Sequence, residues 1–142
     1  GSDTAFVAKM NEFAQRLGLS DTHFANPHGL SSRDHYSSAY DLAILSRYAM
    51  ANPQFAEIVR TRDYVANGSR QIALTNVNPF LDYPGGDGVK TGYTNRAGKT
   101  LVASATRDGH RVYLVLLNAP NREQDAVALM DWAFANYSWT TR

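Results

Sequence analysis

Three consecutive residues, Lys90-Thr91-Gly92, carry the clearest chemical signal in the chain. The Lys90 ammonium can bind a carboxylate as a point charge, and the Thr91 hydroxyl can hydrogen-bond to the same ligand. Gly92 has no side chain, so a ligand backbone can lie close to the strand. These residue types are typical of a strand edge that binds an extended peptide by strand addition. Any given tripeptide occurs by chance in about one or two chains in a hundred of this length, so its surroundings must support this interpretation.

Other residues that often do chemistry have structural explanations. His28 has no clustered ligands beside it, so no metal site is predicted there. Ser38 precedes an acidic residue by three positions, which favours a helix cap over a nucleophile. Asn76 and Asn78 are interpreted as side chains that organise a loop. The sequence therefore predicts no metal and no organic cofactor.

Length and composition indicate one folded domain. The chain has 142 residues, of which 44% are hydrophobic and 19% are charged. Lys plus Arg is 14 and Asp plus Glu is 13, giving a net charge of +1 without a basic arm, which argues against nucleic acid as a partner. Cysteine is absent, which excludes disulfides and thiol catalysis. The helical pattern begins almost at once after Gly1-Ser2, so we expect a mature fragment or a piece of a longer protein.

The elements that must position the Lys-Thr-Gly residues begin with helices. Asp3 is predicted to cap a first helix that ends at Gly18. Ser38 is predicted to cap a second helix, and Asn52-Pro53 to begin a short third one. From Tyr64 the apolar period changes to two, as in strands. The predicted strands are 64–66, 70–74, 89–93, 100–106 and 111–117.

Turn residues and a last helix complete the prediction. Asn67-Gly68 and Asp108-Gly109 predict tight hairpin turns. The strand 111–117 is nearly all apolar, so we expect it to be covered on both faces. Asn121 is predicted to cap the last helix, with Gln124 in the capping-box position. The predicted buried stripe of that helix, facing the sheet, is Val127, Met130, Phe134 and Tyr137. The fold class is therefore α+β, with helices first, then an antiparallel sheet and a covering helix.

Several motifs in a fixed order make the chain resemble a known family. They are Phe6-Val7 to Leu17-Gly18-Leu19, Asp21-Thr22-His23-Phe24, Pro27-His28-Gly29-Leu30, Ser37-Ser38-Ala39-Tyr40-Asp41-Leu42-Ala43, Asp87-Gly88-Val89-Lys90-Thr91-Gly92-Tyr93-Thr94 and Leu101-Val102-Ala103-Ser104-Ala105. With them the chain resembles the serine D-alanyl-D-alanine carboxypeptidases of bacterial cell walls, the low-molecular-mass penicillin-binding proteins. The resemblance implies a partial β-lactamase/transpeptidase-like fold.

The resemblance also implies site residues. In the family, the Lys-Thr-Gly strand binds the carboxylate of the terminal D-Ala or of penicillin, a role that falls on Lys90, Thr91 and Gly92. The next residue, Tyr93, faces the site in relatives. His28 lies in the matching Pro-His-Gly-Leu motif, which the family uses structurally, so the resemblance implies that His28 anchors its loop. Arg122 is the nearest match to an arginine that opens the following helix and faces the site in some relatives. The alternative for Arg122 is a solvated basic residue near a helix start.

The family's nucleophile motifs are absent from this sequence. In the family, Ser-x-x-Lys and Ser-x-Asn act together with Lys-Thr-Gly. No serine in this chain has Lys three residues later, and none has Asn two residues later. The family places both motifs upstream of the position of Asp3. We therefore predict no catalytic residue in this chain, no activity of the chain alone and no covalent labelling by a fluorescent penicillin. Missing neighbouring strands would leave a sheet edge open to association.

These inferences predict one incomplete transpeptidase-like domain over 1–142, with a helical part at 1–60 and a hairpin, sheet and final helix at 61–142. The intact protein is expected to trim the terminal D-Ala from peptidoglycan stem peptides through an acyl-enzyme. It is also expected to bind β-lactam antibiotics and to reside outside the cytoplasm, in the periplasm or cell envelope. Two alternatives stay open: a β-lactamase or transpeptidase of the same fold, and a non-catalytic binding fragment.

Overall fold

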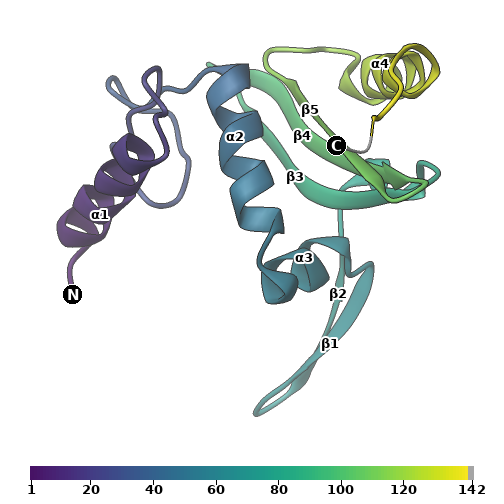
Figure 1. The fold of residues 1–142 in the computed structure, drawn as a ribbon. Coiled ribbons are helices and arrows are strands. Elements are labelled where there is room, and N and C mark those ends of the chain that lie inside the picture. Colours follow the sequence, from purple (N-terminus) through teal and green to yellow (C-terminus); the bar gives the residue numbers. More distant parts are fainter. Residues whose placement is uncertain (141–142) are drawn as a thin grey trace.

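A three-stranded antiparallel sheet, in the order β3-β4-β5, lies at the centre of the computed structural model, which describes residues 1–140. Its strands are β3 (Gly86–Thr94), β4 (Gly98–Arg107) and β5 (His110–Leu116). Helix α2 (Ala39–Met50) packs against one face of this sheet and helix α4 (Arg122–Asn136) against the other (Figure 1). Strand β5 contacts both helices, as its apolar sequence predicted.

The three helices before the sheet begin at polar caps. They are α1 (Asp3–Arg16), α2 and α3 (Pro53–Arg60). Ser38 and Asn52 cap α2 and α3 through their side-chain oxygens, as predicted. The predicted cap of α1 is wrong by one residue, because Ser2 accepts the bond from the Ala5 amide at 3.2 Å. Asp3 is instead the first helical residue, where its charge favours the positive end of the helix dipole.

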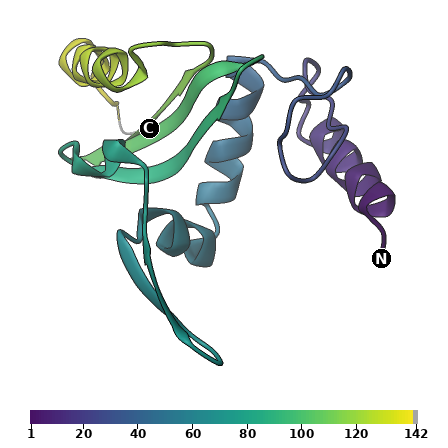
Figure 2. The same cartoon turned by 180° about the vertical axis from the view of Figure 1, so that it is seen from behind.

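Helix α1 lies apart from the central sheet and is joined to α2 by a long loop (Figure 2). The Asn11 side chain holds this loop, because it bonds both the amide and the carbonyl of Phe24 at 2.8 Å. Asp41 of α2 is 2% exposed and accepts bonds from the Asp21 amide and the Thr22 hydroxyl. Residues 21 to 24 of this loop are therefore bonded to both helices.

A two-stranded hairpin projects away from the central sheet (Figures 1 and 2). It consists of β1 (Asp63–Asn67) and β2 (Gln71–Thr75). The predicted two-residue turn at Asn67-Gly68 is wrong, because Asn67 still pairs with Gln71 and the loop spans 68–70. Strand β1 extends one residue beyond the predicted strand at each end, and β2 begins and ends one residue later than predicted. The large apolar side chains of the hairpin are exposed, namely Tyr64, Val65, Ile72 and Leu74.

The hydrophobic core lies between the sheet and α4. It also includes the short 3-10 helix η1 (Pro79–Asp82) and the residue after it, Tyr83. The buried residues of this cluster are Phe80, Tyr83, Leu101, Ala103, Ala105, Ala126 and Met130. Asn76 and Asn78 organise the segment that leads into η1, as predicted, because Asn78 caps it and Asn76 bonds the carbonyls of Val59 and Thr61.

The buried stripe of α4 is rotated relative to the prediction. Met130 is fully buried and Phe134 packs partly against the core, but Val127 is 41% exposed and Tyr137 is 61% exposed. Ala126 faces the sheet in place of Val127, because a methyl side chain lets the helix approach the strands closely. Asn121 stands at the N-cap position without making a side-chain capping bond, so the predicted capping box is wrong.

The turn between β4 and β5 is the predicted one. Asp108 and Gly109 have φ angles of 50° and 77°, the positive values that a type I′ hairpin turn requires. Arg107 pairs with His110 across this turn. Among residues 1–140, none of the helices combines the length and the apolar composition needed to cross a membrane.

Candidate binding site

The Lys-Thr-Gly residues lie on β3, which pairs antiparallel with β4. Lys90 is opposite Val102, Thr91 opposite Leu101 and Gly92 opposite Thr100. In the described part of the chain, the other edge of β3 has no neighbouring strand. This edge therefore has no strand partner, which is the geometry that addition of a ligand as a further strand requires.

An open groove of about 740 Å³ runs beside this edge. One wall is β3 itself, and the opposite wall is the α2 face that carries Leu42, Leu45 and Ala49. The loop residues His28 to Leu30 close one end. The groove is therefore largely apolar, with the Lys90 ammonium as its cationic group.

The predicted site residues differ in exposure. Lys90 is exposed, and its ammonium donates to the Thr91 carbonyl. Thr91 is 8% exposed, and Tyr93 is 66% exposed. A Cβ built on Gly92 would come within 2.6 Å of the Thr100 hydroxyl oxygen, so a side chain here would require that hydroxyl to move. All four residues line the groove.

Arg122 is brought to the same strand from the start of α4. Its guanidinium Nη1 donates to the Gly92 carbonyl at 2.8 Å and to the Thr100 carbonyl at 3.1 Å. Its Nε donates to Glu123 at 3.0 Å. The backbone amide of Glu123, and then Arg122, hold the pKa of the Glu123 carboxyl below its usual value. Arg122 thus bonds the backbone of the motif but is not one of the residues that line the groove.

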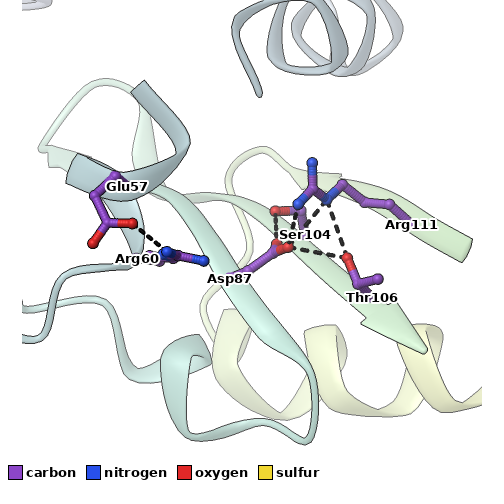
Figure 3. Close-up of polar contacts among 6 residues, drawn as sticks. All are labelled: Glu57, Arg60, Asp87, Ser104, Thr106 and Arg111. Carbon is purple, nitrogen blue, oxygen red and sulfur yellow. Dashed lines mark hydrogen bonds and ion pairs between the residues drawn. The ribbon is translucent and has the colours of Figure 1, made fainter. Parts of the chain in front are cut away.

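A polar network that sequence reasoning missed holds the start of β3 to its neighbours (Figure 3). Asp87 lies at a register shift in β3 and accepts bonds from Ser104 at 2.6 Å and Thr106 at 3.0 Å. Arg111 of β5 donates to the same carboxylate from Nε at 3.0 Å and from Nη2 at 2.7 Å. Burial opposes the Arg111 charge, but bonds to Tyr113 and Asp87 outweigh it and raise the pKa of Arg111.

The loop between α1 and α2 is bonded to the far end of β3. The Ser31 and Thr94 hydroxyls are 2.8 Å apart, and Thr94 also accepts the Ala97 amide at 3.0 Å. His28 accepts the Leu30 amide at 3.2 Å, in agreement with its prediction as a loop anchor. No group of three His, Asp or Glu side chains within residues 1–140 is arranged to hold a metal ion.

Known proteins are similar in sequence to this chain over nearly its whole length. The model of the D-alanyl-D-alanine carboxypeptidase family, peptidase S11, matches residues 1–121. D-alanyl-D-alanine carboxypeptidase DacF of Bacillus subtilis is 40% identical over 96% of this chain and 37% of its own length. The corresponding DacD of Escherichia coli is 38% identical over 97% of this chain and 36% of its own length. The chain thus spans a little more than a third of these two relatives.

Solved structures show the same fold. The Streptomyces K15 DD-transpeptidase superposes with a TM-score of 0.89 at 38% identity, over 95% of this chain and 58% of its own. A D-alanyl-D-alanine carboxypeptidase of Mycobacterium tuberculosis H37Rv gives a TM-score of 0.90 at 36% identity, over 100% of this chain and 58% of its own. The α+β fold is therefore that of the DD-peptidases, present in part. The motifs, the fold and the match over residues 1–121 establish that the chain belongs to the D-alanyl-D-alanine carboxypeptidase family.

Proposed function

We propose that this chain is the substrate-binding portion of the catalytic domain of a serine D-alanyl-D-alanine carboxypeptidase. The observation that carries the proposal is the free edge of β3, which presents Lys90 to Gly92 beside an open groove. A peptide ending in D-Ala-D-Ala would lie antiparallel to β3, with main-chain bonds to the strand edge. Its carboxylate would meet the Lys90 ammonium and the Thr91 hydroxyl.

The other two predicted site residues have supporting roles in this proposal. Tyr93 is exposed on the groove side, where it would contact the ligand upstream of its carboxylate. Arg122 bonds the Gly92 carbonyl, so we assign it to positioning the strand rather than to contacting the substrate. In the proposed domain, residues 1–60 supply the helical wall of the groove and residues 61–142 the hairpin, the sheet and the covering helix.

The chemistry of the whole protein would require a serine from outside this sequence. That serine oxygen would attack the carbonyl carbon between the two D-Ala residues, forming an ester and releasing D-Ala with the serine proton on its amine. Water would then hydrolyse the ester and release the trimmed peptide. The substrate belongs to peptidoglycan, which places the proposed activity outside the cytoplasm. The same edge would bind the carboxylate of a β-lactam.

A DD-transpeptidase is a second candidate, because one structure that superposes on this chain carries that activity in its name. The two reactions share the ester and differ in whether water or an amine accepts the acyl group. The binding role of β3 is the same in both. Comparing release of free D-Ala with formation of a cross-linked product, in the full-length protein, would separate them.

The binding proposal can be tested on the chain itself. We expect N-acylated Lys-D-Ala-D-Ala to bind, and Lys90→Gln to weaken that binding at least tenfold, because it removes a charge-assisted bond. Lys9→Gln on α1, also an exposed lysine, is the matched control and should leave the affinity unchanged. The measurement is a titration followed by NMR. Equal affinities for Lys90→Gln and the unmodified chain would contradict the proposal.

A fluorescent penicillin tests the missing nucleophile. We expect no labelled band at the mass of this chain, because acylation needs a serine with an adjacent base. A labelled band that disappears when a single serine is replaced would instead show that the chain carries its own nucleophile. Binding without labelling would support the substrate-binding role.

A further inference from the structure

A second cavity adjoins the groove at the end of β3. It encloses about 280 Å³ between the loop that precedes α2 and the turn from β3 to β4. The two cavities share Gly29 and Ala97 in their linings, so they are continuous at the surface. We refer to this second space as the Arg33–Arg96 cavity, after the two arginines that line it from opposite walls.

The Arg33–Arg96 cavity is lined by two arginines that form no ion pair within residues 1–140. Within residues 1–140, neither Arg33 nor Arg96 forms an ion pair, and both side chains are exposed. No carboxylate is among the lining residues. Five other arginines do pair with acids, namely Arg60, Arg62, Arg107, Arg111 and Arg122. The cavity is therefore lined by two arginines whose charges are not engaged in ion pairs within residues 1–140.

Neutral donors complete the lining. Ser31 and Ser32 supply hydroxyl groups. His35 is half-buried, and its Nδ1 accepts the Ala25 amide at 3.1 Å. In that neutral tautomer the proton is on Nε2, which leaves a donor on the ring. Arginine, hydroxyl and imidazole donors together fit a carboxylate better than any neutral or cationic group.

The walls of the Arg33–Arg96 cavity are held in place before any ligand binds. The Ser31 hydroxyl bonds that of Thr94 at 2.8 Å, which joins the loop to β3. His23 and Tyr36 pair as an isolated antiparallel bridge, with bonds of 2.9 and 3.0 Å. A preformed cavity reduces the ordering cost of binding.

We propose that the Arg33–Arg96 cavity is a subsite for a carboxylate on the upstream part of the peptide whose terminus lies at Lys90. This inference rests on the proposed function. If the terminal residue lies opposite Thr91 in strand addition, each earlier residue pairs with the next residue of β3, and the fourth residue from the terminus comes opposite Thr94. Thr94 is bonded to the wall of the cavity. An acidic side chain at that fourth position would lie beside the cavity that Arg33 and Arg96 line.

A pair of matched peptides tests the subsite. Both are N-acetylated pentapeptides that end in D-Ala-D-Ala, with glutamate or glutamine as the fourth residue from the carboxyl end. We expect the glutamate peptide to bind the chain about five- to tenfold more tightly, a preference that high salt reduces. Replacing Arg33 and Arg96 by glutamine should abolish the preference. Arg70→Gln, an exposed arginine at the hairpin tip, is the control and should retain it.

Each outcome separates this inference from the proposed function. Equal affinity of the two peptides for the unmodified chain overturns the subsite and leaves the Lys90 proposal standing, without depending on any variant. If neither peptide binds, the proposed function fails for this chain, and the subsite is then tested alone with N-acetylglutamate amide. NMR shifts at Arg33, His35 and Arg96 that are absent with N-acetylglutamine amide would support it, and their absence would overturn it.

Discussion

Two antiparallel ladders in this molecule share the alternating pattern of apolar residues but differ in their surroundings. In the β3-β4-β5 sheet, Leu101, Ala103 and Ala105 are at most 1% exposed. In the β1-β2 hairpin, Tyr64 is 61% exposed and Leu74 is 51% exposed, although they pair directly with each other. The central sheet has helices against it, whereas the hairpin projects from the body (Figure 1). Alternation thus predicts a strand, and only a packed neighbour decides whether the strand is buried.

The difference also concerns function. The buried ladder carries the candidate binding residues on its edge strand, so the rigidity of the site depends on β4 and α4 beneath it. The hairpin contributes nothing to the groove lining. Mutations of comparable size should therefore have unequal effects in the two regions.

Truncating an apolar side chain should lower the free energy of unfolding far more in the core of the central sheet than in the hairpin. Met130→Ala should lower the free energy of unfolding by about 2–5 kcal/mol, because it opens a cavity in a fully buried position. Ile72→Ala in the hairpin, where the side chain is 42% exposed, should cost less than about 1 kcal/mol. Urea unfolding followed by circular dichroism measures both. Similar losses would mean that the hairpin is packed in solution.

The next effect concerns a tyrosine buried under α4. Burial, followed by the Tyr83 hydroxyl bond to Asp131 at 2.5 Å, raises the pKa of Tyr83 to about 12. The unfolded chain would ionise this phenol first, near pH ~10. The contribution of Tyr83 to the free energy of unfolding should therefore be constant below that pH. It should fall by roughly 2 kcal/mol as the pH rises to 12.

Alkaline unfolding curves of two variants isolate this contribution. Tyr83→Phe should lack this part of the alkaline loss, whereas Tyr64→Phe in the exposed hairpin should retain it. If Tyr83→Phe and the unmodified chain lose the same free energy between pH 9 and 12, the buried tyrosine is not responsible.

Figure 3 shows two ion pairs that differ in exposure, Asp87–Arg111 and Glu57–Arg60. Asp87→Asn should cost about 1–2 kcal/mol, because the Asp87 carboxylate is 18% exposed and accepts from Ser104, Thr106 and Arg111. It should also loosen the start of β3, detectable as larger NMR shift changes at Gly88 than at Tyr64. A loss below about 0.5 kcal/mol would indicate that water replaces the network without cost.

The smallest effect is expected at the other pair. Arg60 and Glu57 lie one helical turn apart on α3, with side chains 60% and 62% exposed. Glu57→Gln should change the free energy of unfolding by less than about 0.5 kcal/mol, because water screens an exposed pair. A change as large as that of Asp87→Asn would show that exposure does not separate the two pairs.

Local signals were predictable from the sequence, and contacts between distant residues were not. The caps Ser38 and Asn52 and the Asp108-Gly109 turn depend on neighbours a few residues away, so their residue types suffice. The face of α4 was misassigned, because Ala126 and Val127 are both apolar and differ by one step around the helix. Only the distance between helix and sheet selects the smaller residue.

The candidate site was predictable in the same uneven way. The Lys90 to Gly92 strand and its pairing follow from a local motif and a nearby turn. The bond from Arg122 to the Gly92 carbonyl joins residues 30 positions apart, and the Asp87 to Arg111 pair joins residues 24 apart. No periodic pattern in the sequence indicates either of these two contacts. The glycines on both sides of Asp87 are the single local sign that this stretch of backbone is constrained.

The close approach of Gly92 to Thr100 also has an evolutionary consequence. Alanine at position 92 would place its methyl group 2.6 Å from the Thr100 hydroxyl oxygen, so this substitution is blocked while that hydroxyl keeps its place. A rotation of the Thr100 side chain, or its replacement by a smaller residue, would have to come first. The two positions are therefore epistatic. Mutational paths that change position 92 of β3 therefore depend on order, and the permissive step occurs on the neighbouring strand, at a residue that also lines the groove.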